Sequence, residues 1–149
     1  MIKLRSTTSD DQDFIDLVKE LDTYLKITDG DEHDFYNQFN GIESLQSVLV
    51  AYYNNKPVGC GAFKPYDHES VEVKRMYLKP ENRGSGIAAD ILKTLEISAK
   101  EGGYKRTVLE TGKRQLEAVK FYHKSGYRRI PNYGQYVQMD NSYCFEKRL

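Results

Sequence analysis

The sequence predicts one α/β domain built on a mixed sheet. The chain has 149 residues, the length of a single ordinary domain, and no repeat, linker or low-complexity tract divides it. Apolar runs and alternating segments typical of strands occur between segments that have apolar residues at helical spacing. Their order begins with a strand, a helix and three strands in sequence and closes with strand–helix–strand, which indicates a mixed α/β sheet over residues 1–149.

The first predicted strand, residues 1–7, is followed by the start signals of a helix. Residues 9–12 predict a capping box, in which Ser9 satisfies a free amide and Gln12 reaches back. One apolar stripe then follows at helical spacing: Phe14, Ile15, Val18, Leu21 and Leu25. Residues 29–40 are acidic and rich in turn residues, and we expect a loop with a short second helix there.

Three strands are predicted in the middle of the chain. Ser47–Tyr53 is a buried apolar run, residues 54–57 form a turn, and residues 58–64 are its hairpin partner. Residues 71–78 alternate in character and predict a fourth strand. A helix begins at Ile87 and ends before two glycines at 102–103. Residues 106–110, 127–130 and 142–147 are predicted strands that complete the sheet. A helix is predicted at residues 115–124, between the first two of them.

Composition excludes several classes of protein. The 22 basic and 22 acidic side chains balance, whereas a protein that coats nucleic acid favours a strongly basic surface, so no nucleic-acid partner is expected. No run approaches the ~20 apolar residues of a membrane span. Cys60 and Cys144 are too few for a disulfide framework, and neither they nor the three histidines have metal-ligand spacing. We therefore expect a soluble, cytoplasmic protein without a metal.

The balanced total conceals a segregation of charge. Residues 1–45 carry 4 basic and 11 acidic side chains, and residues 46–149 carry 18 and 11. The segregation of charge indicates either two solvated faces or an anion-binding site opposite a cation-binding site. In the second case, neutralising Asp31, Glu32 and Asp34 should raise KM for a cationic substrate.

A glycine-rich loop, residues 79–86, joins the fourth strand to the next helix. The first turn of a helix leaves amides without partners and carries partial positive charge, and Gly84 and Gly86 let those amides approach an anion. Arg83 and Lys79 add positive charge, so the loop predicts a phosphate or pyrophosphate site. The pattern also satisfies the spacing of a dinucleotide fingerprint, but residues 79–83 intervene between the strand and the first glycine, which disfavours that alternative.

Two motifs resemble the GNAT superfamily of N-acyltransferases. Arg83-x-x-Gly86-x-Ala88 is similar to the acyl-CoA signature of that family and follows the fourth strand, as it does there. Further along, Leu109-Glu110-Thr111-Gly112 and then Ala118-x-x-Phe121-Tyr122-x-x-x-Gly126-Tyr127 resemble the family's strand–helix–strand segment. The resemblance covers residues 71–127. Gln115 stands where many members carry asparagine, and Ala88 replaces the commoner glycine.

The resemblance implies a mixed, mostly antiparallel central sheet flanked by helices, in which the fourth and fifth strands splay apart around acetyl-CoA. Backbone groups of Met76, Tyr77 and Leu78 would pair with the pantetheine arm, and Gln115 would lie near the cofactor. The pyrophosphate would be held by the amides of Arg83, Gly84, Ser85, Gly86, Ile87 and Ala88.

The implied activity is N-acetyl transfer by direct attack of an amine on the thioester. Tyr122, at the matching position, would protonate the leaving thiolate, and an amide near Met76 or Tyr77 would contact the oxyanion. Glu72 is a candidate base, with solvent or the acidic segment as rivals and an exposed strand residue paired with Lys74 or Arg75 as the alternative. A catalytically silent acyl-CoA-binding module is the alternative function.

The acceptor side is less defined by the sequence. Tyr133 and Tyr136, together with Tyr36, would shape the entry of a small-molecule amine or a peptide amino group; the alternative is that they are simple surface tyrosines. The identity of the amine stays open. The strand at residues 142–147 could pair across a homodimer.

Overall fold

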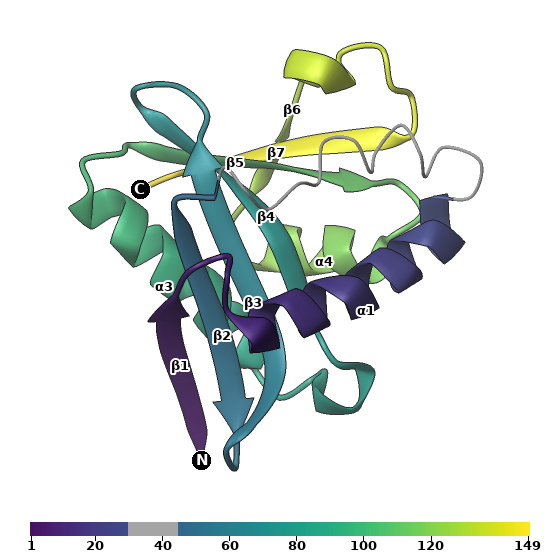
Figure 1. Ribbon diagram of the computed structural model, residues 1–149. Coiled ribbons are helices and arrows are strands. Elements are labelled where there is room, and N and C mark those ends of the chain that lie inside the picture. The colour runs from purple at the N-terminus through teal and green to yellow at the C-terminus, as the bar shows by residue number, and fades with distance from the viewer. Residues whose placement is uncertain (30–44) are drawn as a thin grey trace.

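The computed structural model of the chain describes residues 1–29 and 45–149 (Figure 1). Within these residues, seven strands form one sheet in the order β1-β2-β3-β4-β5-β7-β6. All neighbouring strands are antiparallel except β4 and β5, which are parallel, so the predicted mixed, mostly antiparallel sheet is confirmed. The strands are β1 (Ile2–Thr7), β2 (Ser47–Tyr53), β3 (Lys56–Pro65), β4 (Ser70–Leu78), β5 (Arg106–Gly112), β6 (Arg128–Ile130) and β7 (Ser142–Arg148).

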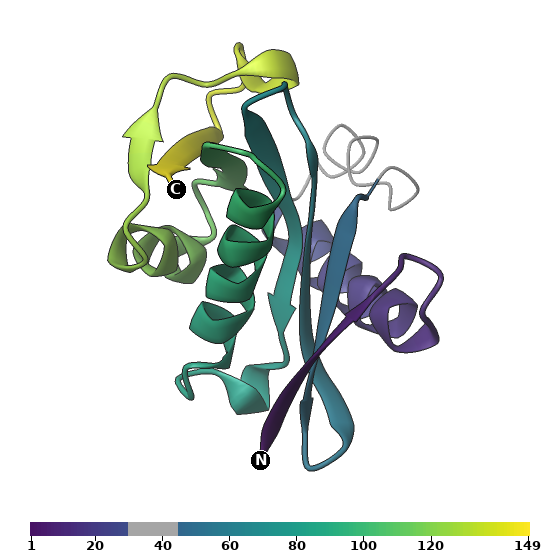
Figure 2. The same cartoon turned by 90° about the vertical axis from the view of Figure 1, so that its left-hand side faces the viewer.

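The described helices cover both faces of the sheet: α1 (Gln12–Asp29) lies on one face, and α3 (Ile87–Glu101) and α4 (Leu116–Lys124) lie on the other (Figure 2). Phe14 and Leu17 of α1 are buried in one core with residues of β2 and β3. Ile91 and Leu95 of α3 are buried in the larger core on the opposite face. None of these described helices is both long and apolar enough to cross a membrane.

The start of α1 differs from the predicted capping box. The helix begins at Gln12, and the carboxylate of Asp11 accepts hydrogen bonds from the backbone amides of Asp13 at 2.8 Å and Phe14 at 3.3 Å. Asp11, and not Ser9, therefore satisfies the free amides of the first turn. The prediction of Ser9 as the cap was wrong because aspartate two residues later offers an equally good acceptor.

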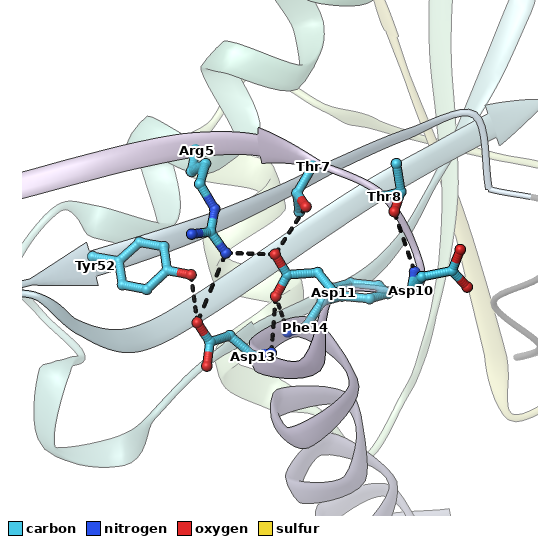
Figure 3. A network of polar contacts seen from close by, with 8 residues as sticks. All are labelled: Arg5, Thr7, Thr8, Asp10, Asp11, Asp13, Phe14 and Tyr52. Atoms are coloured by element: carbon cyan, nitrogen blue, oxygen red, sulfur yellow. Dashed lines mark hydrogen bonds and ion pairs between the residues drawn. The ribbon is translucent and has the colours of Figure 1, made fainter.

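The same aspartate ties α1 to the edge of the sheet (Figure 3). Thr7 donates a hydrogen bond to Asp11 at 2.8 Å, and Arg5 forms ion pairs with Asp11 and Asp13. The hydroxyl of Tyr52 donates to Asp13 at 2.6 Å, and burial together with this carboxylate raises the pKa of Tyr52 to about 12. These contacts join β1 and β2 to the helix and fix how α1 crosses the sheet.

A β-bulge interrupts β4 beside its neighbour β3. Gly61 lies opposite both Arg75 and Met76, and Arg75 has the left-handed φ of 59°. Position 61 favours glycine, because a Cβ atom there would lie 2.5 Å from the Met76 sulfur and 2.8 Å from Ile91, so these side chains would have to shift. The bulge bends β4 and turns the backbone that follows it.

The parallel strands β4 and β5 pair only at one end. Residues 70–72 are in register with residues 106–108, whereas residues 73–78 and 109–112 have no pairing with one another. On its other edge, β5 pairs along its whole length with β7. The sheet is therefore open between β4 and β5, as the resemblance implied.

The remaining predicted elements occur with bounds that differ by one or two residues. Cys60 and Cys144 are buried free thiols on strands. Residues 144–146 of β7 pair with both β5 and β6, so these positions cannot extend the sheet across a dimer as expected. The short second helix expected within residues 29–40 lies outside the described residues, apart from the end of α1.

Candidate active site

A pocket of about 110 Å³ lies where β4 and β5 separate. Residues of α1 line it from one face of the sheet, and residues of α4 line it from the other. Five residues predicted for the site are among its walls: Glu72, Met76, Gln115, Tyr122 and Tyr136. The pocket thus brings together these five side chains, which are up to 64 positions apart in the sequence.

Glu72 is held firmly in this pocket. Its side chain is buried, so the alternative of an exposed strand residue is wrong. The hydroxyl of Tyr133 donates a hydrogen bond to the Glu72 carboxylate at 2.6 Å. On its other side, the carboxylate lies 3.9 Å from the ammonium of Lys74 and 4.0 Å from that of Lys64. Glu72 is therefore a buried carboxylate with one neutral donor and two cations around it.

Tyr122 faces the same pocket from α4. Its ring packs against those of Phe121, Tyr127 and Phe145, with centroids 5.2, 5.8 and 6.1 Å away. Burial, and then the negative charge of Glu110, raise the pKa of Tyr122 above its ordinary value. The phenol is therefore both fixed in place and protonated at neutral pH.

Tyr133 and Tyr136 lie close to the pocket, next to Glu72. Their rings meet edge to face at 5.9 Å, and Tyr66 packs on Tyr133 at 4.9 Å. Tyr136 is buried and lines the pocket, so the alternative of simple surface tyrosines is wrong for it. Tyr36, the third tyrosine expected here, lies outside the described residues.

Nine further residues line the pocket and were not predicted for the site, among them Leu21, Leu25, Lys74, Arg75 and Glu110. Lys74 is buried, and the loss of hydration lowers its pKa although the charge of Glu72 opposes this. Glu110 was considered only as part of the Leu109–Gly112 motif. Both strands carry further charged residues, so no signal in the sequence marks these two as enclosed.

Arg75 holds the bulge of β4 in position. Its guanidinium is buried and forms an ion pair with Asp22 of α1 at 2.5 Å. Its carbonyl accepts a hydrogen bond from the Cys60 thiol at 3.3 Å. These contacts offset the cost of a left-handed backbone in a non-glycine residue, which is about 1–3 kcal/mol.

The loop after β4 has the open glycine turn that was predicted. Gly84 and Gly86 have φ values of 79° and 85°, and no described atom lies within 4 Å of a Cβ built on either. Gly86 caps α3, and the first turn with Ile87 and Ala88 follows it. The Ser85 hydroxyl donates to the carbonyl of Asn82 at 2.5 Å, which closes the turn. The amide groups of this first helical turn are thus open to an anion.

The two cations of the loop are engaged elsewhere. Arg83 donates to the carbonyl of Leu78 at 3.0 Å and lies over the ring of Tyr77, with 6.0 Å to the centroid. Lys79 lies 3.3 Å from the carboxylate of Glu20, and its contact with a phosphate stays a prediction. The acidic first part of the chain and the basic second part therefore neutralise each other in part, across the contact between α1 and β4.

The open sheet, the glycine-capped helix and the buried tyrosine and carboxylate together define an acyltransferase that takes its acyl group from acyl-CoA. Comparison with known proteins agrees. The sequence profile of the Acetyltransferase (GNAT) family matches residues 14–127. The chain belongs to this family, and it is an acetyl-CoA-dependent N-acetyltransferase.

Individual proteins show the same likeness. An "IAA acetyltransferase" of Azospirillum brasilense is 33% identical over 144 residues, which are 91% of this chain and 90% of that protein. A crystal structure from Klebsiella pneumoniae, of a candidate acyl-CoA N-acyltransferase, superposes with a TM-score of 0.84 at 26% identity, covering 100% of this chain and 98% of that one. A GNAT family acetyltransferase from Elizabethkingia anophelis with acetyl-CoA bound superposes with a TM-score of 0.73 at 22% identity, covering 99% and 98%.

Proposed function

We propose that the chain acetylates a primary amine of a small molecule or peptide by direct attack of the amine on the thioester of acetyl-CoA. One observation carries the proposal: Glu72 and Tyr122 line the same pocket from opposite sides of the opening between β4 and β5. Glu72 can accept a proton from an attacking amine, and Tyr122 can donate a proton to a leaving thiolate.

The cofactor would enter along the unpaired part of β4. Its pyrophosphate would bind the amides of residues 84–88, because an open helix start with two glycines favours an anion. The amide of Arg83, which was predicted to join them, donates to the carbonyl of Pro80 at 3.2 Å instead. The pantetheine arm would pair with the backbone of Met76, Tyr77 and Leu78, which does not pair with β5, and at Leu78 it would compete with Arg83 for the carbonyl. Gln115 would contact the cofactor from the start of α4.

The reaction needs a neutral amine, a stabilised oxyanion and a protonated leaving group. Glu72 would take the proton of the amine on the carboxylate oxygen that Tyr133 does not occupy. A backbone amide of the bulge near Met76 would donate to the oxyanion. Tyr122 would then pass its proton to the sulfur as the carbon–sulfur bond breaks. A phenol titrates near ~10 and a thiol near ~8.5, so transfer must accompany cleavage.

The surroundings of Glu72 favour an amine as the acceptor. Glu72 and Glu110 provide two carboxylates in the pocket, and Tyr136 provides an aromatic wall. Tyr133 packs against Tyr136 from outside the pocket. Carboxylates with aromatic rings attract an ammonium group, which then loses its proton before attack.

A panel of amines with acetyl-CoA tests the proposal. Release of CoA thiol is measured for diamines, amino acids, aminoglycosides and short peptides, with thiol release in the absence of amine subtracted. We expect saturable release with at least one class and an acetylated amine of the matching mass. CoA binding without amine-dependent release across the panel would contradict the proposal.

A further inference from the structure

Lys74 is a lysine in the proposed reaction pocket for which the mechanism above has no use. Its side chain is 6% exposed, and it lines the pocket together with Glu72 and Tyr122. Most lysines are exposed because burial of an ammonium is costly. A primary amine is thus already present where an acceptor amine would react.

The surroundings of Lys74 suit a nucleophile. Its Nζ lies 3.9 Å from the carboxylate of Glu72, the group proposed to accept the amine proton. Burial lowers the pKa of Lys74, so the neutral and nucleophilic form is more populated than in an exposed lysine. The pocket, at about 110 Å³, is smaller than the roughly 300–1,000 Å³ of ordinary ligand pockets, so the groups that line it lie near one another.

We propose that Lys74 is a self-acetylation site, which takes an acetyl group from acetyl-CoA bound in its own chain. This inference rests on the proposed function. The Nζ lone pair attacks the thioester carbonyl carbon, and a carbon–nitrogen bond forms. The carbon–sulfur bond breaks, the amine proton passes to Glu72, and the thiolate leaves as CoA thiol with a proton from Tyr122. The products are acetyl-lysine and CoA.

The modification would change the charge of the pocket. An acetylated Lys74 is a neutral amide, so Glu72 loses its nearest cation in the pocket and keeps Lys64 at 4.0 Å. Glu110 lines the same pocket. The site then carries more negative charge, which favours a cationic acceptor over a neutral or anionic one.

The chain offers matched controls for a test. Lys64 contacts the same Glu72 oxygen from β3 but does not line the pocket. Lys105 is 71% exposed, so it reports ordinary chemical acetylation by the thioester. The purified protein is incubated with acetyl-CoA and no amine, and intact mass and peptide mapping then locate the acetyl group.

We expect one acetyl group per chain, on Lys74, with Lys105 unmodified at the same time point. The Lys74→Arg variant should lose this mass increase, Lys64→Arg should keep it, and Tyr122→Phe should slow it. The unaltered protein provides the primary reading, so the result does not depend on whether Lys74→Arg folds. An unmodified Lys74, or label spread over exposed lysines at the rate seen in urea-unfolded protein, would overturn the inference.

The two proposals fail separately. If amines are acetylated and Lys74 is not, the self-acetylation site is wrong and the proposed function stands. If Lys74 is acetylated and no amine in the panel is, the inference holds and the acceptor class is wrong.

Discussion

Replacement of Tyr122 by phenylalanine removes one buried oxygen and keeps the ring. Because its packing with Phe121, Tyr127 and Phe145 depends on the ring, the free energy of unfolding should change by about 1 kcal/mol or less. A positioned general acid contributes about 10²–10⁴-fold to a rate. We therefore expect kcat to fall by at least about 10²-fold, equivalent to ~3 kcal/mol of barrier, with unchanged affinity for CoA.

Tyr127→Phe is the matched control. Tyr127 is also buried and contacts the ring of Tyr122, but its hydroxyl bonds Thr107 and Glu96 and does not line the pocket. Loss of the Tyr127 hydroxyl should lower the free energy of unfolding by about 1–3 kcal/mol, because the buried carboxylate of Glu96 loses a hydrogen-bond donor. It should leave kcat nearly unchanged. Thiol release under single-turnover conditions and urea denaturation measure both quantities. Equal kcat for Tyr122→Phe and the unaltered chain would refute the role of Tyr122.

From the raised pKa of Tyr122 we predict how kcat depends on pH. A group with a raised pKa stays protonated to higher pH, so this acid remains competent beyond the ordinary tyrosine value of about 10. The kcat profile should therefore show no alkaline decline from Tyr122 below roughly pH 10. A decline there that disappears in Tyr122→Phe would contradict the assigned burial effect.

Three further substitutions separate the parts of the site. Gly61→Ala should lower the free energy of unfolding in chemical denaturation by about 1–3 kcal/mol, because the added Cβ is crowded beside the bulge. Gly102→Ala, whose Cβ would have ordinary contacts of 3.4 Å and more, should lower it less. Equal losses of stability would argue against the packing explanation. Gly86→Val should weaken the binding of CoA measured by calorimetry and leave the binding of pantetheine, which lacks the pyrophosphate, unchanged. An equal loss of affinity for both ligands would show that the loop is not the pyrophosphate site. Tyr133→Phe frees the oxygen of Glu72 that its hydroxyl now occupies and should lower kcat more than it changes KM for acetyl-CoA; a change confined to that KM would assign Tyr133 to the cofactor.

The strands and helices could be predicted because their signals are local. Gly102 ends α3 as expected, and the alternation of residues 71–78 marks β4. The cap of α1 could not be fixed in the same way, since Ser9 and Asp11 are both good acceptors. The contacts of Asp11 with Arg5 and Thr7 on β1 select it, and these contacts exist only in the folded sheet.

The pocket could not be predicted from local sequence patterns alone, because it forms from segments that are far apart in the chain. Tyr122 and the glycine loop were found through their motifs, whereas Lys74 and Glu110 alternate with apolar residues and therefore suggest a solvated strand face. They are enclosed because α1 and the segment with Tyr136 cover that face. The separation of β4 from β5, which creates the pocket, begins after Glu72, just before the bulge at Arg75, and local periodicity does not contain this departure from pairing.

A crystal structure with CoA tests the central claim most directly. The account predicts that the pantetheine arm lies along Met76–Leu78, that the pyrophosphate contacts the amides at Gly84 and Gly86, and that the sulfur lies within hydrogen-bond distance of the Tyr122 hydroxyl. A CoA molecule bound outside the opening between β4 and β5, or with its sulfur remote from Tyr122, would contradict it.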